Sequence, residues 1–183
     1  MFRLEPVAAH HEAAFVAAAR ASRGLHHPWI APPRSPVSFR AHVKRYSARD
    51  QVSYMAVDTQ DGGLIGAVHL NEIVYGALES AYMAYFAFVP YAGRRYMRAV
   101  MAAVIEQAFG GLRLHRLEAN IQPGNQPSKR LVQSLGFRLE GFSPRYLRIN
   151  GAWRDHERYA LTSEDWQSRT RPASEGSAGD GDS

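Results

Sequence analysis

The chain has 183 residues, of which 45% are hydrophobic and 21% charged, and this length favours one globular domain over two. It contains no cysteine and no apolar run of about 18 residues, which excludes disulfides, thiolate ligands, a cysteine nucleophile and a membrane-spanning helix. The net charge of +5 suits a nucleic acid, an anionic small ligand or a ribosomal neighbour equally well.

The first half of the chain predicts two helices followed by three strands. An alanine-rich helix is expected over 10–22 and a second helix over 37–46. Four prolines make Leu25–Pro36, between these helices, an irregular loop. Three runs rich in aromatic and β-branched residues then predict an antiparallel meander: 52–57, 62–73 and 80–89.

The second half predicts a long helix, a strand, a capped helix and a hairpin. Apolar residues share one helical face from Arg94 to Phe109, and "HRLEANI" (115–121) is typical of a strand. Asn125 is the expected cap of a helix that stops at Gly136. Asn150-Gly151 between two strand-like runs predicts a hairpin. We therefore expect one domain over 1–168 and a disordered tail over 169–183, which is poor in apolar residues.

Two sequence segments resemble those of a known family. "NQPSKRLVQSLGFRLEG" (125–141), followed by "INGAWRDHERYAL" (149–161), resembles the RimJ/RimL branch of the GNAT acetyltransferases, the ribosomal-protein-alanine N-acetyltransferases. The resemblance covers about Phe2 to Trp166. It implies an α/β (α+β) fold, with a mixed, mostly antiparallel sheet that is flanked by helices and splayed between its fourth and fifth strands. Acetyl-CoA, the expected cosubstrate, would lie in that opening, and no metal is expected.

The resemblance also implies contacts with acetyl-CoA. The pantetheine arm would pair with the end of the fourth strand, and the pyrophosphate would meet the turn into the long helix, where the first amides lack intrahelical partners. Asn125 and Ser128 of "NQPS" would contact the pantetheine and the thioester. The expected cofactor-binding residues are Phe86, Ala87, Phe88, Val89, Gly93, Arg94, Arg95, Tyr96, Met97, Asn125 and Ser128.

One residue of the cofactor turn departs from the family pattern. The branch often has Gly-Arg-Gly-Tyr-Met where this chain has Gly93-Arg94-Arg95-Tyr96-Met97, so Arg95 replaces the central glycine. Arginine there costs about 1 kcal/mol or more if the position needs a positive φ, and nothing if φ is helical. In either case the amides remain, and we expect Arg94, Arg95 or Arg98 to add a charge-assisted contact to a CoA phosphate.

Glu118 and Ser128 are the predicted catalytic residues. Strand alternation puts Glu118 and Asn120 on one face, and a glutamate there resembles the base proposed in related N-terminal acetyltransferases. Ser128 would protonate the leaving thiolate or orient the sulfur. Val132 stands where related enzymes often have an acidic tyrosine, so either Ser128 or water must supply the proton. The alternatives are a solvated strand carboxylate for Glu118 and an ordinary first-turn serine for Ser128.

Two histidine-bearing segments have ordinary structural explanations. His26, His27 and Trp29 either line the acceptor mouth or form an exposed loop anchored by one aromatic side chain, and the second is favoured. In "WRDHERY", alternation places Arg154, His156 and Arg158 on one face. A structural hairpin with cross-strand ion pairs is favoured there over a metal site.

The resulting hypothesis is an acetyl-CoA-dependent N-acetyltransferase in which a primary amine attacks directly in a ternary complex. The preferred acceptor is the N-terminal alanine of a ribosomal or other protein. The alternatives are a small amine (antibiotic, polyamine or amino acid) and a non-catalytic acyl-CoA-binding or ribosome-associated module. We expect a cytoplasmic protein without a membrane partner; a homodimer is compatible with the sequence, which does not determine the oligomeric state. Direct nucleic-acid binding is not favoured, because the arginines of the last two strands are scattered.

Overall fold

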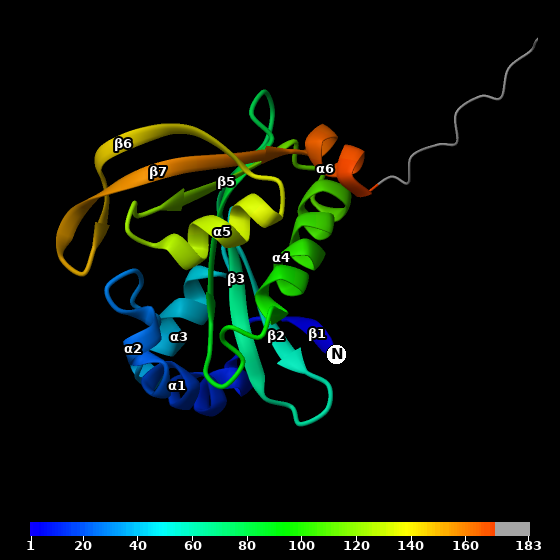
Figure 1. The fold of residues 1–183 in the computed structure, drawn as a ribbon. Helices are drawn as coiled ribbons and strands as arrows, with labels where there is room; N and C mark the ends of the chain where they lie inside the picture. Colours follow the sequence, from blue (N-terminus) through cyan, green and yellow to red (C-terminus); the bar gives the residue numbers. More distant parts are fainter. Residues whose placement is uncertain (171–183) are drawn as a thin grey trace, which may run out of the picture.

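Seven strands form one sheet in the computed structural model, which describes residues 1–170 (Figure 1). The sheet order is β1-β2-β3-β4-β5-β7-β6, and every neighbouring pair is antiparallel except β4 and β5. The predicted mixed, mostly antiparallel sheet is confirmed. The strands are β1 (Phe2–Pro6), β2 (Val52–Asp58), β3 (Leu64–Val74), β4 (Ser80–Ala87), β5 (Arg116–Ile121), β6 (Arg138–Ile149) and β7 (Ala152–Thr162).

The sheet is open between β4 and β5, as predicted. The two strands pair in parallel only from Ser80 to Tyr82, opposite Arg116 to Glu118. Beyond Tyr82, β4 continues to Ala87 paired with β3 alone. The outer edge of β4 therefore presents main-chain groups that β5 does not satisfy.

Helices cover both faces of the sheet. In Figure 1, α4 and α5 lie in front of the strands, and the core between α4 and the sheet includes Val100, Val104 and Leu117. A second cluster packs Phe15 of α1 and Phe39 of α3 against the other side. The helices are η1 (Ala9–His11), α1 (Glu12–Ala21), α2 (Arg23–His26), α3 (Pro36–Arg45), α4 (Tyr96–Glu106), the π-helical turn η2 (Gln107–Gly111), α5 (Gln126–Ser134) and α6 (Ser163–Thr170).

The predicted cap and hairpin are confirmed. Asn125 Oδ1 accepts a hydrogen bond from the Ser128 amide at 3.3 Å, and α5 ends before Gly136, whose φ is +97°. Asn150 and Gly151 have φ of +50° and +82° between β6 and β7. Positive φ at both central residues gives a turn whose twist matches the hairpin strands.

Several predicted boundaries need correction. Leu25 and His26 belong to α2 and not to an irregular loop, and the long helix begins at Tyr96 instead of Arg94. Helix α6 was not predicted, and it includes the first two residues of the expected tail; the rest of 169–183 lies outside the described residues. Among the helices of residues 1–170, none is long and apolar enough to cross a bilayer.

Arg95 adopts the conformation that favours glycine. It precedes α4 with φ +64° and ψ +2°, in the left-handed region, and its side chain makes no capping hydrogen bond. This conformation costs a non-glycine residue about 1 kcal/mol or more because Cβ crowds the backbone. Of the two alternatives considered for Arg95, a positive φ that costs stability and a helical φ that does not, the first therefore applies.

We predict that Arg95→Gly stabilises the protein. Removing Cβ relieves the left-handed strain, so the free energy of unfolding in urea should rise by about 1 kcal/mol. Arg94→Gly is the control, because Arg94 is also exposed but lacks a positive φ. It should lower stability by roughly 0.5 kcal/mol through the freer unfolded chain. If both variants lose stability alike, Arg95 is not strained.

Candidate active site

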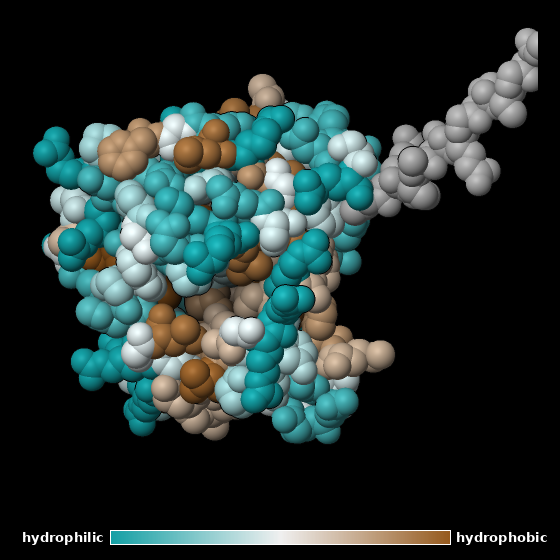
Figure 2. All heavy atoms as spheres, in the orientation of Figure 1, coloured by the Kyte–Doolittle hydropathy of each residue, from teal (hydrophilic) through white to brown (hydrophobic). Residues whose placement is uncertain are grey.

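A cavity of about 680 Å³ occupies the opening between β4 and β5. Its walls come from β3, β4, β5, α3, the proline-rich segment, the start of α5 and the β6–β7 hairpin. Figure 2 shows the surface hollowed below α5, with apolar residues (brown and tan) inside and hydrophilic ones around them. The opening thus places the main chain of β4, the first turn of α5 and the last hairpin around one space.

Ser128 lies at this cavity and meets a tyrosine from β4. The hydroxyl oxygens of Ser128 and Tyr85 are 2.5 Å apart, and the Asn125 cap fixes the turn that carries Ser128. Burial raises the pKa of Tyr85, so its hydroxyl keeps its proton at neutral pH. Because Asn125 uses its carbonyl oxygen in the cap, its amide nitrogen remains available to a ligand. The predicted residues Asn125 and Ser128 are therefore brought together.

The end of β4 presents alternate main-chain groups to the opening. Phe88 donates its amide to Ile65 O of β3, so the groups of Ala87 point the other way. The Ala87 carbonyl accepts a hydrogen bond from His26 Nε2 at 2.7 Å, and the Val89 amide donates to Ser22 Oγ at 3.0 Å. Part of the expected pantetheine edge, Phe86 to Val89, is thus already bonded to the α1–α2 segment. The Ala87 amide remains open.

The turn before α4 offers several unpaired amides. Arg94 donates its amide to Tyr91 O, whereas four other amides find no acceptor within residues 1–170: Gly93, Arg95, Tyr96 and Met97. The Tyr91 hydroxyl donates to Asp61 at 2.8 Å, which ties the turn to the β2–β3 hairpin. A Cβ on Gly63 would lie 2.2 Å from that hydroxyl, so only glycine fits there. The amides and the exposed side chains of Arg94, Arg95 and Arg98 suit an anion.

Glu118 lies at the closed end of the opening, where β4 and β5 still pair. Its Oε1 accepts a hydrogen bond from Arg116 Nε at 2.9 Å, and Arg116 also bonds Glu140. Its strand neighbour Asn120 lines the cavity, but Glu118 does not. Of the two predicted catalytic residues, only Ser128 is placed against the cavity.

Neutral polar groups form the inner wall of the cavity. Within residues 1–170, four buried side-chain atoms lack a hydrogen-bond partner, and three of them belong to residues that line the cavity: His42 Nε2, His69 Nε2 and Asn120 Oδ1. Burial lowers the pKa of His42 to about 4 and that of His69 well below its ordinary value, so both rings are uncharged at neutral pH. The charged lining residues are one acid, Glu72, and two arginines, Arg45 and Arg148.

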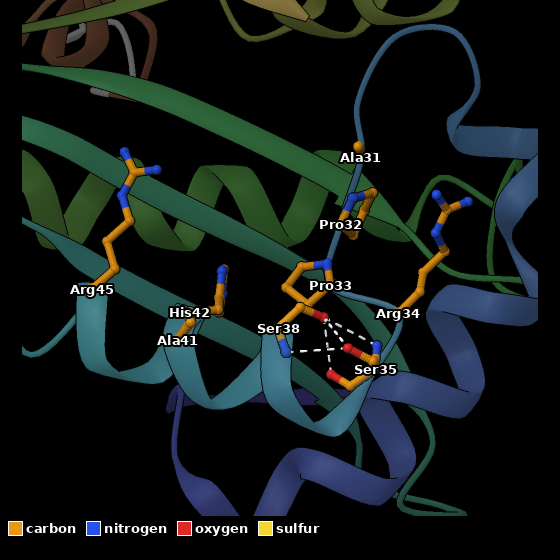
Figure 3. A pocket seen from close by; sticks show the side chains of 9 residues that line it. All are labelled: Ala31, Pro32, Pro33, Arg34, Ser35, Ser38, Ala41, His42 and Arg45. Atoms are coloured by element: carbon orange, nitrogen blue, oxygen red, sulfur yellow. Dashed lines mark hydrogen bonds between the residues drawn. The ribbon is translucent and has the colours of Figure 1, made fainter. Parts of the chain in front are cut away.

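The proline-rich segment forms the mouth of this cavity. A shallower pocket of about 600 Å³ lies beside α3 and shares Pro32, His42 and Arg45 with the cavity (Figure 3). Hydrogen bonds between Ser35 and Ser38 begin α3 at its rim. Trp29 also lines the larger cavity. The preferred expectation of an exposed loop is wrong for His26, which is buried with 4% of its surface exposed.

The β6–β7 hairpin also differs from expectation. Among the described residues no ion pair joins β6 to β7; Glu157 instead pairs with Lys129 of α5 at 2.9 Å. His156 and Tyr146 line the cavity. Sequence reasoning gave His156 a structural role only and did not single out Tyr146 or Tyr85, because their convergence depends on pairings between strands far apart in the chain.

One cluster outside the cavity carries metal-type ligands: Glu5, His10 and His11. The Ala8 amide donates to His11 Nδ1 at 3.2 Å, so the ring proton lies on Nε2, which donates to Glu5 Oε2 at 3.0 Å. A neutral imidazole used in this way has no free lone pair for a metal. The cluster is instead a structural hydrogen-bond network.

Comparison with known proteins agrees with this geometry. Residues 2–138 match the family model described as "Acetyltransferase (GNAT) domain". The probable N-acetyltransferase YjcK of Bacillus subtilis is 35% identical over 130 residues, which cover 69% of this chain and 72% of that protein. The [ribosomal protein uS5]-alanine N-acetyltransferase of Escherichia coli is 34% identical over 109 residues, covering 60% of this chain and 56% of that protein.

A solved relative contains CoA. The structure described as Mycobacterium smegmatis RimJ in complex with CoA-disulfide has a TM-score of 0.81 and 30% identity, covering 90% of this chain and 83% of that one. Spermidine N-acetyltransferase from Vibrio cholerae, in complex with CoA and spermine, has a TM-score of 0.77 at 20% identity and shows the shared fold. The open sheet, the free amides before α4 and the matched domain have one explanation: the chain belongs to the GNAT family and is an N-acetyltransferase whose fold binds acyl-CoA.

Proposed function

We propose that the protein transfers the acetyl group of acetyl-CoA to the N-terminal amine of a protein, with the N-terminal alanine of a ribosomal protein as the leading candidate. The charge of the acceptor cavity is the observation that carries this proposal. Its charged lining residues are Glu72, Arg45 and Arg148. The similarity to the E. coli uS5-alanine enzyme agrees with it.

The acceptor's own charge separates a peptide from a polyamine. A polyamine keeps one or more ammonium groups after the reacting amine has lost its proton, and each needs a carboxylate partner when it leaves water. The exposed Glu72 is the sole acid among the lining residues, and two arginines oppose it. A peptide N-terminus has no other ammonium in its main chain, and its peptide groups suit the neutral donors and acceptors of His42, His69 and Asn120.

The transfer is a direct attack. The chain has no cysteine to carry the acetyl group. The neutral amine attacks the thioester carbonyl carbon, a C–N bond forms, the C–S bond breaks and the thiolate leaves. Ser128 supplies the proton for that sulfur, with the Tyr85 hydroxyl hydrogen-bonded behind it. Orientation of the two substrates in one cavity provides much of the remaining rate acceleration.

The acetyl-CoA would be held by the groups that are open at the β4 edge and before α4. The Ala87 amide is the donor suited to a pantetheine carbonyl, because His26 already occupies the Ala87 carbonyl. The amides of Gly93 and Arg95 to Met97 would face the pyrophosphate, and the arginines beside them would add charge.

We predict that peptides beginning with Ala are acetylated in preference to small amines. Purified protein is incubated with acetyl-CoA and either Ala-starting peptides or spermidine at equal amine concentration, and CoA release is measured. A kcat/KM at least ten times higher for the best peptide is expected. Spermidine turnover that equals or exceeds peptide turnover contradicts the acceptor assignment, and no CoA release with any peptide contradicts it as well.

Ser128→Ala should lower kcat about 100-fold, because the leaving thiolate loses its proton donor. The KM for the acceptor should change little, since the amine does not contact this hydroxyl before the reaction. Ser134→Ala is the matched control, because Ser134 lies exposed on the same helix and its hydroxyl donates to the Leu131 carbonyl. Equal kcat values for wild type and Ser128→Ala would remove Ser128 from the mechanism.

Arg95→Gly should weaken acetyl-CoA binding even though it relieves backbone strain. Loss of one charge-assisted contact to a phosphate corresponds to a dissociation constant about 10-fold higher, measured by calorimetry at low salt. Arg113→Gly is the control, because Arg113 also has a positive φ of +54° but lies beyond η2, away from the turn. Unchanged or tighter binding by Arg95→Gly would refute the compensating role of the arginine.

A further inference from the structure

His156 combines burial with access to the acceptor cavity. It lies in β7, 2% of its surface is exposed, and it lines the same cavity as Ser128. Its partner across the β6–β7 ladder is Ser143, and the ring of Tyr146 lies 6.2 Å away. The proposed mechanism above gives this side chain no role.

The hydrogen bonding of His156 fixes which ring nitrogen is free. Its Nδ1 lies 2.9 Å from the carbonyl oxygen of Arg154. A carbonyl oxygen only accepts hydrogen bonds, so Nδ1 carries the proton and Nε2 holds a lone pair. Within residues 1–170, the ring of His156 makes its hydrogen bond through Nδ1, and no hydrogen bond involves Nε2. The ring is thus oriented by its own strand and keeps its basic atom for another partner.

The surroundings keep this imidazole neutral. Burial lowers the pKa of His156, and the bond to Arg154 O together with the charge of Asp155 opposes that shift only in part. Asp155 itself accepts a hydrogen bond from the Arg145 amide. The residues that face the ring from β6 are Ser143 and Tyr146, which bear hydroxyl groups, and Arg148 is the cationic residue of β6 that lines the cavity. At pH 7 the ring can accept a proton.

We propose that His156 is the general base that removes the proton from the acceptor amine, an inference that rests on the proposed acetyl transfer. As the amine nitrogen bonds to the carbonyl carbon, its N–H proton moves to His156 Nε2. The electrons of the breaking C–S bond remain on sulfur, which takes a proton from Ser128. His156 then releases its proton to water and Ser128 regains one, so protons balance over one turnover.

Glu118 is the competing candidate for the base. The surroundings of its carboxylate differ from those of the His156 imidazole. The Glu118 carboxylate is engaged by Arg116 and lies outside the cavity lining, whereas His156 Nε2 has no protein donor and its ring lines the cavity. A base must come within hydrogen-bond reach of the amine or of one bridging water. His156 has access to an amine bound in the cavity, whereas Glu118 does not.

The kinetic test compares His156→Asn with wild type. The asparagine amide nitrogen can keep the bond to Arg154 O but supplies no base. We expect kcat to fall at least 100-fold, with the acetyl-CoA dissociation constant within two-fold of wild type. In wild type, kcat should fall as His156 becomes protonated at acid pH, and this dependence should be absent in the variant. His10→Asn, which changes an exposed histidine outside the cavity, should retain wild-type kcat.

Two results would overturn the assignment. One is a kcat of His156→Asn within three-fold of wild type. The other is a fall of kcat at acid pH that is unchanged in His156→Asn. If that fall is instead lost in Glu118→Gln, the base is Glu118. If Ala-starting peptides are not acetylated but another primary amine is, the proposed acceptor fails and the same comparison is made with that amine.

A measurement on the resting enzyme needs no acceptor. Nitrogen NMR of ¹⁵N-histidine-labelled protein, assigned with His156→Gln, should show protonated Nδ1, unprotonated Nε2 and a titration midpoint below the ordinary value of about 6.5. Protonated Nε2 at pH 7 would refute the base role whether or not the acceptor is a protein N-terminus.

Discussion

The interrupted pairing between β4 and β5 is the constraint on which the site depends. Buried main-chain donors and acceptors must find partners, and beyond Tyr82 strand β5 no longer supplies them. Two are satisfied from the α1–α2 segment, by His26 at the Ala87 carbonyl and by Ser22 at the Val89 amide. The Ala87 amide is left for a ligand with an amide-like carbonyl, which the pantetheine arm of acyl-CoA provides.

The same interruption brings the proposed catalytic side chains to one cavity. Because β4 and β5 diverge, Tyr85 reaches the first turn of α5 and contacts Ser128, while His156 reaches the cavity from β7.

Arg95, in the turn before α4, combines a cost in stability with a gain in anion binding. Its left-handed backbone costs stability, yet it leaves the amides of Gly93 and Arg95 to Met97 unpaired and places a guanidinium beside them. A strained residue here is consistent with selection for anion binding over stability.

Local chemistry explains which parts of the fold were predictable. The Asn125 cap, the stop at Gly136 and the Asn150-Gly151 turn depend on residues within a few positions of one another, and the structure has all three. The open sheet followed from family resemblance, since periodicity does not reveal where two parallel strands separate. The short α2 was missed because the prolines that follow it dominate the local pattern, although they begin only at Pro28.

The candidate site was less predictable because its contacts join distant segments. Ser128 and Asn125 were predicted from one short sequence motif, "NQPS". Tyr85, in contrast, is 43 residues from Ser128, and His26 is 61 residues from Ala87. The side of a strand on which His156 lies follows from alternation, whereas the cavity it faces depends on how the hairpin extends past the end of β5. Glu118 shows the opposite case, since a correct strand face did not place it in the cavity.

Amide hydrogen exchange with and without acetyl-CoA tests the central claim most directly. If the β4–β5 opening holds the acyl-CoA, peptides covering the end of β4 and the turn before α4 should exchange more slowly when it is bound, while peptides covering β1 and β2 should not change. Equal exchange at the end of β4 in both states, or protection confined to another part of the chain, would contradict this account.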